Sequence, residues 1–136
     1  MQAYNSDTII IGGGLIGLAQ ALALAAHGIT SHVIDRADPQ AMLALGFDGR
    51  TSAISSASMA MFEALGLGTA LAGKGCPIGQ IWVSDGLKPG EIDFVPGNDD
   101  GYLGMMFENR VLRRTLYEAA LARPEISLHM PVDIDT

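Results

Sequence analysis

The chain has 136 residues, which is enough for one domain with a hydrophobic core. Hydrophobic residues make up 49% of the sequence and charged residues 17%, a composition that excludes a disordered chain. Its 15 acidic residues outnumber its 8 basic ones, and the net charge of −7 argues against a nucleic-acid-binding surface, which needs clustered Lys and Arg.

Cysteine and histidine usage indicates the cellular compartment and argues against a metal site. The single Cys76 excludes a disulfide framework within the chain and favours a reducing compartment, so we expect a cytoplasmic protein. His27, His32 and His129 are scattered along the sequence, and no Cys/His cluster has the spacing of metal ligands. The sequence therefore predicts no metal site.

The stretch from Asp7 to Arg36 has the pattern of a βαβ unit. Thr8–Ile11 is a β-branched apolar run, typical of a strand buried on both faces of a parallel sheet. A glycine-rich turn follows, then a helical pattern that ends at His27 and Gly28, then a second strand over Thr30–Ile34. We therefore predict an α/β, Rossmann-like dinucleotide-binding fold.

The glycine-rich turn fits G-x-G-x-x-G and suits the pyrophosphate of a dinucleotide. Gly12 allows a tight turn, Gly14 lets the backbone approach the phosphates, and Gly17 lets the helix pack closely. The first helical turn, at Leu15 and Ile16, directs N–H groups and the positive end of the helix dipole at the pyrophosphate. These five residues form the first part of the predicted cofactor site.

The second strand ends in an acid–arginine pair. Asp35 is placed to accept hydrogen bonds from a ribose. Arg36 has three readings: it stacks on adenine, it meets the 2′-phosphate of NADP, or it faces water. The motif continues through Ala21, Leu24 and Gly28 to Asp35, and this longer spacing resembles the signature of two-domain flavoproteins.

Residues 8–26 carry no charge, so a secretory signal and a membrane span are the alternatives for this stretch. A signal peptide needs a positive leader, but no Lys or Arg precedes Arg36. Three consecutive glycines would also weaken a spanning helix. We expect neither.

Helices and then short strands are expected after this unit. A short helix is predicted over Gln40–Leu45 and a longer one over Ala53–Leu65. The core-facing residues of the longer helix are predicted to be Ile54, Ala57, Met61, Ala64 and Leu65. Residues 67–101 change to strands and turns, and we predict that they belong to a second, antiparallel layer over the nucleotide domain. Its clearest part is a hairpin with strands Gln80–Ser84 and Glu91–Val95 and a turn at Asp85–Gly90.

The last third returns to alternating strands and helices. Gly104–Phe107 is expected to be extended, and Asn109 has the residue type of an N-cap for a helix over Arg110–Ala122. Strands are predicted over Ile126–His129 and Val132–Asp135. The inner face of the helix is predicted to contain Val111, Leu112, Leu116, Ala119 and Ala120.

Two positions here have both a functional and a structural reading. Arg50 can bind the pyrophosphate with its forked guanidinium, or it can be a solvated arginine at a helix start. Asn109 or Arg110 can contact the cofactor's ribityl chain or phosphates, or Asn109 can be a plain N-cap beside a solvated basic face.

Four segments together resemble the aromatic-ring flavoprotein monooxygenases: GGGLIGLAQALALAAHG, the pair Asp35-Arg36, DGRTSAISSASMAMFEALGL and ENRVLRRTL. Among these enzymes, the chain is similar to the ubiquinone-biosynthesis hydroxylases of the 2-octaprenyl-6-methoxyphenol hydroxylase type. The resemblance extends from Asp7 to about His129. It implies FAD as cofactor, NAD(P)H as co-substrate, and hydroxylation of an aromatic ring with O₂.

By position, the resemblance assigns Gly12, Gly14 and Gly17 to the pyrophosphate and Asp35 to the adenosine ribose. It places Arg36 by the adenine, Arg50 by the phosphates and Asn109 by the ribityl chain. The family acid at the end of the second strand is usually Glu, so the shorter Asp35 has less reach.

Two later family motifs, a D-G and a G-D motif at the cofactor, are not found in this sequence. We therefore expect 1–136 to be the N-terminal part of an FAD-binding domain, inactive alone, in which no catalytic residue can be named. A polyprenylated aromatic substrate would bring the protein to the inner membrane as a peripheral protein, and exposed sheet edges would permit self-association. The alternatives are another FAD-dependent oxidoreductase and a non-enzymatic NAD-binding module.

Overall fold

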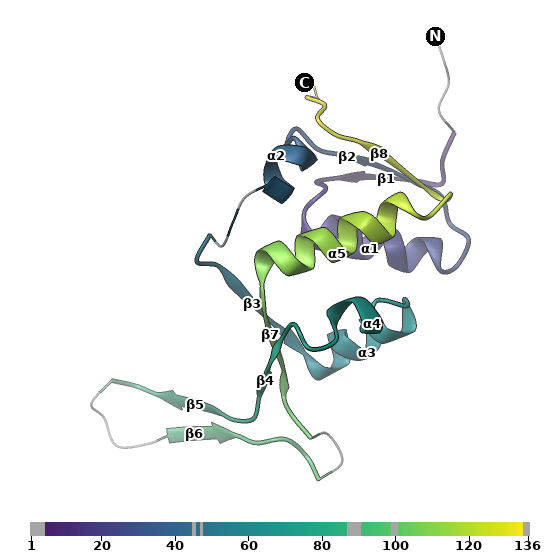
Figure 1. The fold of residues 1–136 in the computed structure, drawn as a ribbon. Coiled ribbons are helices and arrows are strands. Elements are labelled where there is room, and N and C mark those ends of the chain that lie inside the picture. Colours follow the sequence, from purple (N-terminus) through teal and green to yellow (C-terminus); the bar gives the residue numbers. More distant parts are fainter. Residues whose placement is uncertain (1–4, 45, 47, 87–90, 99–100, 135–136) are drawn as a thin grey trace. The chain divides into compact units, whose positions relative to one another are not determined.

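A computed structural model describes residues 5–44, 46, 48–86, 91–98 and 101–134 of the chain (Figure 1). The chain divides into two compact units. The first comprises residues 1–48 and 110–136, and the second comprises residues 49–109. The fold is mixed α/β, as the sequence predicts, and the βαβ unit lies within the first unit.

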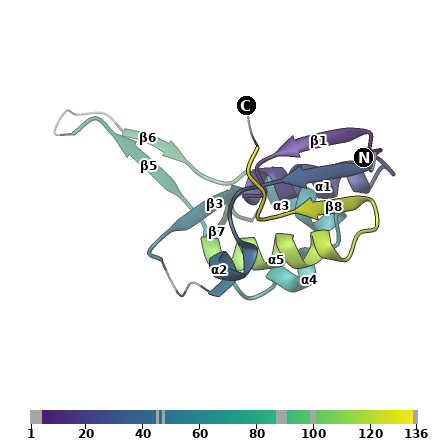
Figure 2. The same cartoon turned by 90° about the horizontal axis from the view of Figure 1, so that it is seen from above.

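The first unit contains a parallel sheet of three strands: β1 (Thr8–Ile11), β2 (Ser31–Ile34) and β8 (Ile126–His129). Their order is β1-β2-β8, so β1 and β8 are the two edges, as Figure 2 shows. Ile10 pairs with Val33, and Val33 pairs with Leu128 across the sheet. The three predicted strands are confirmed, with the second starting one residue later than expected.

Helices α1 (Leu15–Ala25) and α5 (Asn109–Leu121) run along one face of this sheet (Figure 1). Apolar side chains on the inner faces of both helices pack into the core, because a surface helix must bury its apolar stripe. A short helix, α2 (Pro39–Ala44), follows β2 and confirms the short helix predicted in this region. The buried hydrophobic residues of this unit are Ile10, Leu18, Ala21, Leu22, Ala25, Val33, Leu112, Leu116, Ala120 and Ile126.

The expectation that β1 is buried on both faces is wrong. Ile10 is buried, but the side chains of Ile9 and Ile11 are 66% and 73% exposed. Successive side chains of a strand point to opposite faces of the sheet. Within the described residues, helices cover only the face that holds Ile10, so its two neighbours face outward.

The second unit contains an antiparallel sheet in the order β3-β7-β4, formed by β3 (Thr51–Ser55), β7 (Gly104–Glu108) and β4 (Cys76–Ile78). Two helices, α3 (Ser56–Ala64) and α4 (Gly68–Leu71), belong to this unit. Its buried hydrophobic residues are Met59, Phe62, Leu67, Leu71 and Phe107.

The helix expected to start at Ala53 starts at Ser56 instead. Residues 51–55 form β3, which pairs with β7 along its whole length, so the pairing overrides the local helical pattern. Ser55 then caps the helix, and its hydroxyl accepts a hydrogen bond from the Ser58 backbone N–H at 3.2 Å. The inner face also differs: Met59 and Phe62 are buried, whereas Met61, predicted to be core-facing, is 40% exposed.

Strands β5 (Ile81–Ser84) and β6 (Glu91–Phe94) pair antiparallel, which confirms the predicted hairpin strands. Part of the predicted turn, residues 87–90, lies outside the described residues. The assignment of residues 67–101 to a second, antiparallel layer over the nucleotide domain stays a prediction.

The strand predicted over Val132–Asp135 is wrong over residues 132–134. Residues 132–134 have no regular secondary structure, and Asp135 lies outside the described residues. Pro131, which lacks a backbone N–H, precedes this segment and disfavours continuation of the sheet. Within the described part of the chain, no helix has the length and apolar character needed to span a membrane.

Candidate functional site

The turn between β1 and α1 is tied to the end of β2. The backbone N–H of Gly12 donates to the carbonyl oxygen of Ile34 at 2.8 Å. Gly12 has a φ of +110°, a conformation that L side chains rarely adopt, so glycine is required for this turn. The predicted tight turn at Gly12 is confirmed.

The other two motif glycines differ in their surroundings. A Cβ at Gly17 would collide with the backbone carbonyl oxygen of Gly12, so Gly17 permits the helix to approach the turn itself. A Cβ at Gly14 would have no atom within 4 Å. The space in front of Gly14 is therefore open, as the predicted close approach of a phosphate requires.

The glycine between them, Gly13, also has a packing role. A Cβ there would lie 2.6 Å from both the sulfur and the terminal methyl carbon of Met130, in the segment after β8. Sequence reasoning did not single out Gly13, because its contact is made with a residue that lies far along the chain.

The N-terminus of α1 has the features of an anion-binding site. Its N-cap is Gly14, which has no side chain to cap the helix, and its first turn contains no acidic residue. The first hydrogen bond of the helix joins Leu18 N–H to Gly14 O at 3.0 Å. The N–H groups of Leu15, Ile16 and Gly17 precede that bond and lie at the positive end of the helix dipole. These groups suit a pyrophosphate.

Asp35 follows β2 directly and is held by two backbone N–H groups. Its Oδ2 accepts from Gly13 at 2.6 Å, and its Oδ1 accepts from Ala37 at 2.8 Å. A carboxylate has about four lone-pair sites, so each oxygen retains acceptor capacity for a ribose hydroxyl. The carboxylate therefore links the end of β2 to the glycine-rich turn.

A pocket of about 350 Å³ lies at the carboxyl ends of β1 and β2. Ligands of parallel α/β sheets bind at this position, outside the carboxyl ends of the strands. Arg36 is exposed and lines the pocket beside Asp35. The full lining consists of Ile11, Gly12, Ile34, Asp35, Arg36, Val132, Asp133 and Ile134.

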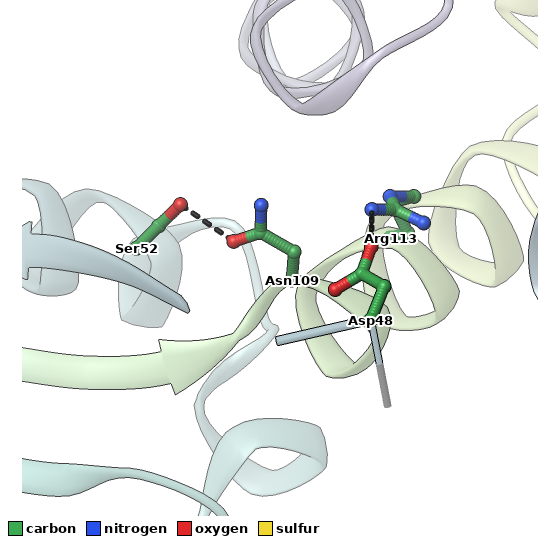
Figure 3. Close-up of polar contacts among 4 residues, drawn as sticks. All are labelled: Asp48, Ser52, Asn109 and Arg113. Carbon is green, nitrogen blue, oxygen red and sulfur yellow. Dashed lines mark hydrogen bonds and ion pairs between the residues drawn. The ribbon is translucent and has the colours of Figure 1, made fainter. Parts of the chain in front are cut away.

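A smaller cavity of about 100 Å³ lies behind the turn and is lined by Gly13, Gly14, Tyr117 and Arg113, among others. Arg113 forms an ion pair with Asp48, with Nη2 and Oδ2 3.0 Å apart (Figure 3). Its Nη1 is buried and has no hydrogen-bond acceptor among the described residues. The sequence gives no signal for this pairing, because Asp48 and Arg113 lie far apart along the chain.

In the second unit, Arg50 and Asn109 lie side by side. The Asn109 backbone N–H donates to the Arg50 carbonyl oxygen at 3.0 Å, which extends the β3–β7 ladder by one pair. The Ser52 hydroxyl donates to Asn109 Oδ1 at 2.7 Å (Figure 3). Two residues that sequence reasoning selected separately are thus neighbours.

The N-cap reading of Asn109 is wrong. Asn109 is the first residue of α5, and its side-chain oxygen accepts from Ser52 across the ladder. The amide oxygen therefore binds to the strand.

The predicted site residues therefore form two groups. Gly12, Gly14, Leu15, Ile16, Gly17, Asp35 and Arg36 belong to the first unit, and Arg50 and Asn109 belong to the second. Among the described residues, no group of three or more His, Cys, Asp or Glu side chains could hold a metal ion.

Comparisons with known proteins identify the family of the chain and some of its relatives. Residues 5–133 match the family model described as FAD binding domain. Ubiquinone hydroxylase UbiL of Rhodospirillum rubrum is 40% identical over 126 residues, which are 93% of this chain and 29% of that protein. The 3-demethoxyubiquinol 3-hydroxylase of Escherichia coli is 34% identical over 133 residues, which are 96% of this chain and 34% of that protein.

A crystal structure of PqsL, a probable FAD-dependent monooxygenase from Pseudomonas aeruginosa, has a similar fold, with a TM-score of 0.69 and 19% sequence identity. The similarity covers 96% of this chain and 34% of PqsL. The chain thus spans about a third of the length of the curated relatives it matches.

Proposed function

Because the chain belongs to the FAD binding domain family, we propose that it is the FAD-binding part of a flavoprotein monooxygenase. The complete enzyme hydroxylates an aromatic ring with NAD(P)H and O₂, in ubiquinone biosynthesis. The observation that carries the proposal is the Asp35 carboxylate, which accepts from Gly13 N–H beside the open N-terminus of α1. The identity to two ubiquinone hydroxylases supports the choice of reaction.

The first unit holds the adenosine and pyrophosphate end of FAD. The N–H groups of Leu15, Ile16 and Gly17 bind the pyrophosphate, since no side chain caps them. The remaining lone pairs of Asp35 accept hydrogen bonds from the ribose hydroxyls. Arg36 lies beside the adenine at the exposed side of the pocket.

The second unit contributes Arg50 and Asn109. Arg50 binds a phosphate oxygen and Asn109 contacts the ribityl chain. Their cross-strand pairing supports a joint role, because it fixes the spacing of the two backbones. FAD, once bound, supplies the redox and oxygen chemistry, and these residues bind and orient it.

The names of the two ubiquinone hydroxylases support a substrate class. We propose an aromatic quinone precursor that carries a polyprenyl chain, delivered at the surface of the inner membrane, with the protein as a peripheral, cytoplasmic partner. Self-association is part of the same proposal, since β1 and the β5–β6 hairpin expose apolar side chains.

The test begins with the purified full-length protein. We expect it to carry bound FAD, identified by its absorption spectrum and by mass spectrometry after denaturation, and to oxidise NAD(P)H while hydroxylating a polyprenylphenol. A protein that binds NAD tightly and contains no flavin would favour the non-enzymatic module instead. A flavoprotein that oxidises other substrates without hydroxylating the ring would indicate another oxidoreductase class.

The isolated 136-residue chain is the second arm of the test. We expect no NAD(P)H- and O₂-dependent product from it, because it spans about a third of its relatives' length. NAD(P)H- and O₂-dependent product formation by the isolated chain would contradict this expectation.

A further inference from the structure

The hydrogen bond between Ser52 and Asn109 has no role in the function proposed so far. It joins two residues that are far apart in the sequence: one in β3, the other at the start of α5 (Figure 3). The distance from Ser52 Oγ to Asn109 Oδ1 is 2.7 Å, which is optimal for a hydroxyl donor.

The register of the ladder explains why these side chains meet. Ser52 pairs with Phe107, and the Asn109–Arg50 hydrogen bond continues the ladder in the same register. Side chains alternate between the faces of a sheet, so Ser52, Phe107 and Asn109 share one face. Phe107 on that face is buried to 1% exposure, which holds the two strands in a fixed position.

This bond selects one of the two orientations of the Asn109 amide. An amide can turn over with almost no change of shape, exchanging its oxygen and its NH₂ group. In the observed orientation, the Ser52 hydroxyl hydrogen has an acceptor. In the other orientation it would have none, because the described residues give Ser52 no second acceptor. The flipped NH₂ group would still donate to Ser52 Oγ, but the hydroxyl hydrogen would then be an unpaired donor in a half-buried group, and this cost disfavours the flipped amide.

In the selected orientation, the Asn109 NH₂ group points away from Ser52. Among the described residues this group has no acceptor. It therefore presents two N–H donors and no acceptor to a ligand. Such a group complements hydroxyl or phosphate oxygens, whereas a flipped amide would turn its carbonyl oxygen toward them.

We propose that Ser52 is a positioning residue for the flavin cofactor, holding the Asn109 amide so that its N–H groups donate to an oxygen of the ribityl chain. This proposal rests on the proposed function, in which Asn109 contacts FAD. Ser52 itself does not touch the cofactor.

The test measures the dissociation constants of FAD and of ADP for the full-length apoprotein. We expect Ser52→Ala to weaken FAD binding roughly fivefold, the effect of about one hydrogen bond. ADP lacks the ribityl chain, so its affinity should stay unchanged. Ser52→Thr keeps the hydroxyl and suits a strand, so it should restore FAD affinity to within about twofold of the original value.

Two controls separate positioning from a general structural effect. Thr51→Ala changes the neighbouring residue, on the opposite face of the same strand, and should leave FAD affinity unchanged. In an Asn109→Ala background, Ser52→Ala should have no further effect, because the amide it orients is gone.

The outcomes are distinct for the two proposals. Equal weakening of FAD and ADP by Ser52→Ala, or additive effects of Ser52→Ala and Asn109→Ala, would overturn the positioning role. Unchanged FAD affinity in Ser52→Ala would overturn it as well. An original protein with no affinity for FAD would instead overturn the proposed function.

Discussion

Arg113 and Asp48 form an ion pair at the point where the chain leaves the first unit. Arg113 Nη2 lies 3.0 Å from Asp48 Oδ2, and the two side chains are only 13% and 20% exposed. Asp48 is the last residue of the first unit before the chain continues to Gly49 and Arg50. The ion pair therefore fixes the segment that precedes one of the proposed phosphate ligands.

Replacing Arg113 should destabilise the protein. We expect Arg113→Met to lower the free energy of unfolding by about 1–2 kcal/mol, between the values for exposed and buried pairs, because Asp48 loses this partner. Urea denaturation measures this value. Arg114→Met is the matched control: Arg114 is exposed, and among the described residues its side chain donates to Leu43 O alone, at 3.3 Å, so its loss should cost less than about 0.5 kcal/mol. Equal losses for both variants would contradict a special role for Arg113.

Substitutions at Gly17 and Gly14 should separate an effect on folding from an effect on cofactor binding. Gly17→Ala should lower the free energy of unfolding by about 1–3 kcal/mol, since its methyl group would collide with the Gly12 carbonyl oxygen. Gly14→Ala should leave stability nearly unchanged, because its φ of −78° suits alanine and nothing lies near the added methyl group.

Gly14→Ala should nevertheless weaken FAD binding by about tenfold or more, equivalent to about 1.4 kcal/mol, because the methyl group occupies the space that the pyrophosphate needs. Titration of the apoprotein with FAD, beside urea denaturation of both variants, provides the comparison. A Gly14→Ala protein that binds FAD normally would show that the pyrophosphate does not lie against this residue.

Both oxygens of the Asp35 carboxylate should contribute to stability, because each accepts a hydrogen bond from a backbone N–H. Asp35→Asn replaces one acceptor oxygen with an NH₂ group, which must then face the N–H of Gly13 or of Ala37. We expect a loss of about 1–3 kcal/mol in stability and a weaker FAD complex. Thermal unfolding with and without FAD measures both effects. An Asn variant as stable as the original protein would show that these two contacts contribute little.

The carboxyl group of Asp7 should make the stability of the folded protein depend on pH in the acidic range. Hydrogen bonds from the backbone N–H and the hydroxyl of Thr30, both at 2.8 Å, lower the pKa of Asp7 below its usual value. A lowered pKa in the folded state stabilises the protein above the unfolded-state pKa of about 4, and this contribution is lost as the pH falls through the folded-state pKa.

The comparison of Asp7→Asn with the original protein tests this dependence. The original protein should be the more stable of the two at neutral pH, and the difference in melting temperature should shrink as the pH falls below about 4. A constant difference across this range would mean that the ionised carboxylate is not the stabilising form.

The βαβ unit could be predicted from the sequence because its signals are local. The glycine spacing, the apolar run before it and Asp35 after it all lie within one short stretch, and the structure places them as expected. The exposed face of β1 could not be predicted this way, since a run of isoleucines has the same sequence whether one or both faces are covered.

The errors arose where distant residues determine the structure. Residues 53–55 look helical alone, but they belong to β3 and pair with β7, which follows much later in the chain. Asn109 is a residue type that often caps helices, but its side-chain oxygen accepts a hydrogen bond from the Ser52 hydroxyl. The Arg113–Asp48 pair likewise joins positions that no local pattern connects.

The glycine-rich turn carries two hydrogen bonds to the end of β2: from Gly12 N–H to Ile34 O, and from Gly13 N–H to Asp35 Oδ2. Both contacts are made by the protein alone, so the turn has its shape before a ligand arrives. The conformational entropy of this segment is therefore lost when the protein folds, and its loss does not weaken the binding of the dinucleotide. A dinucleotide should therefore exchange reversibly, and the apoprotein should regain its cofactor on simple mixing, with no slow refolding step.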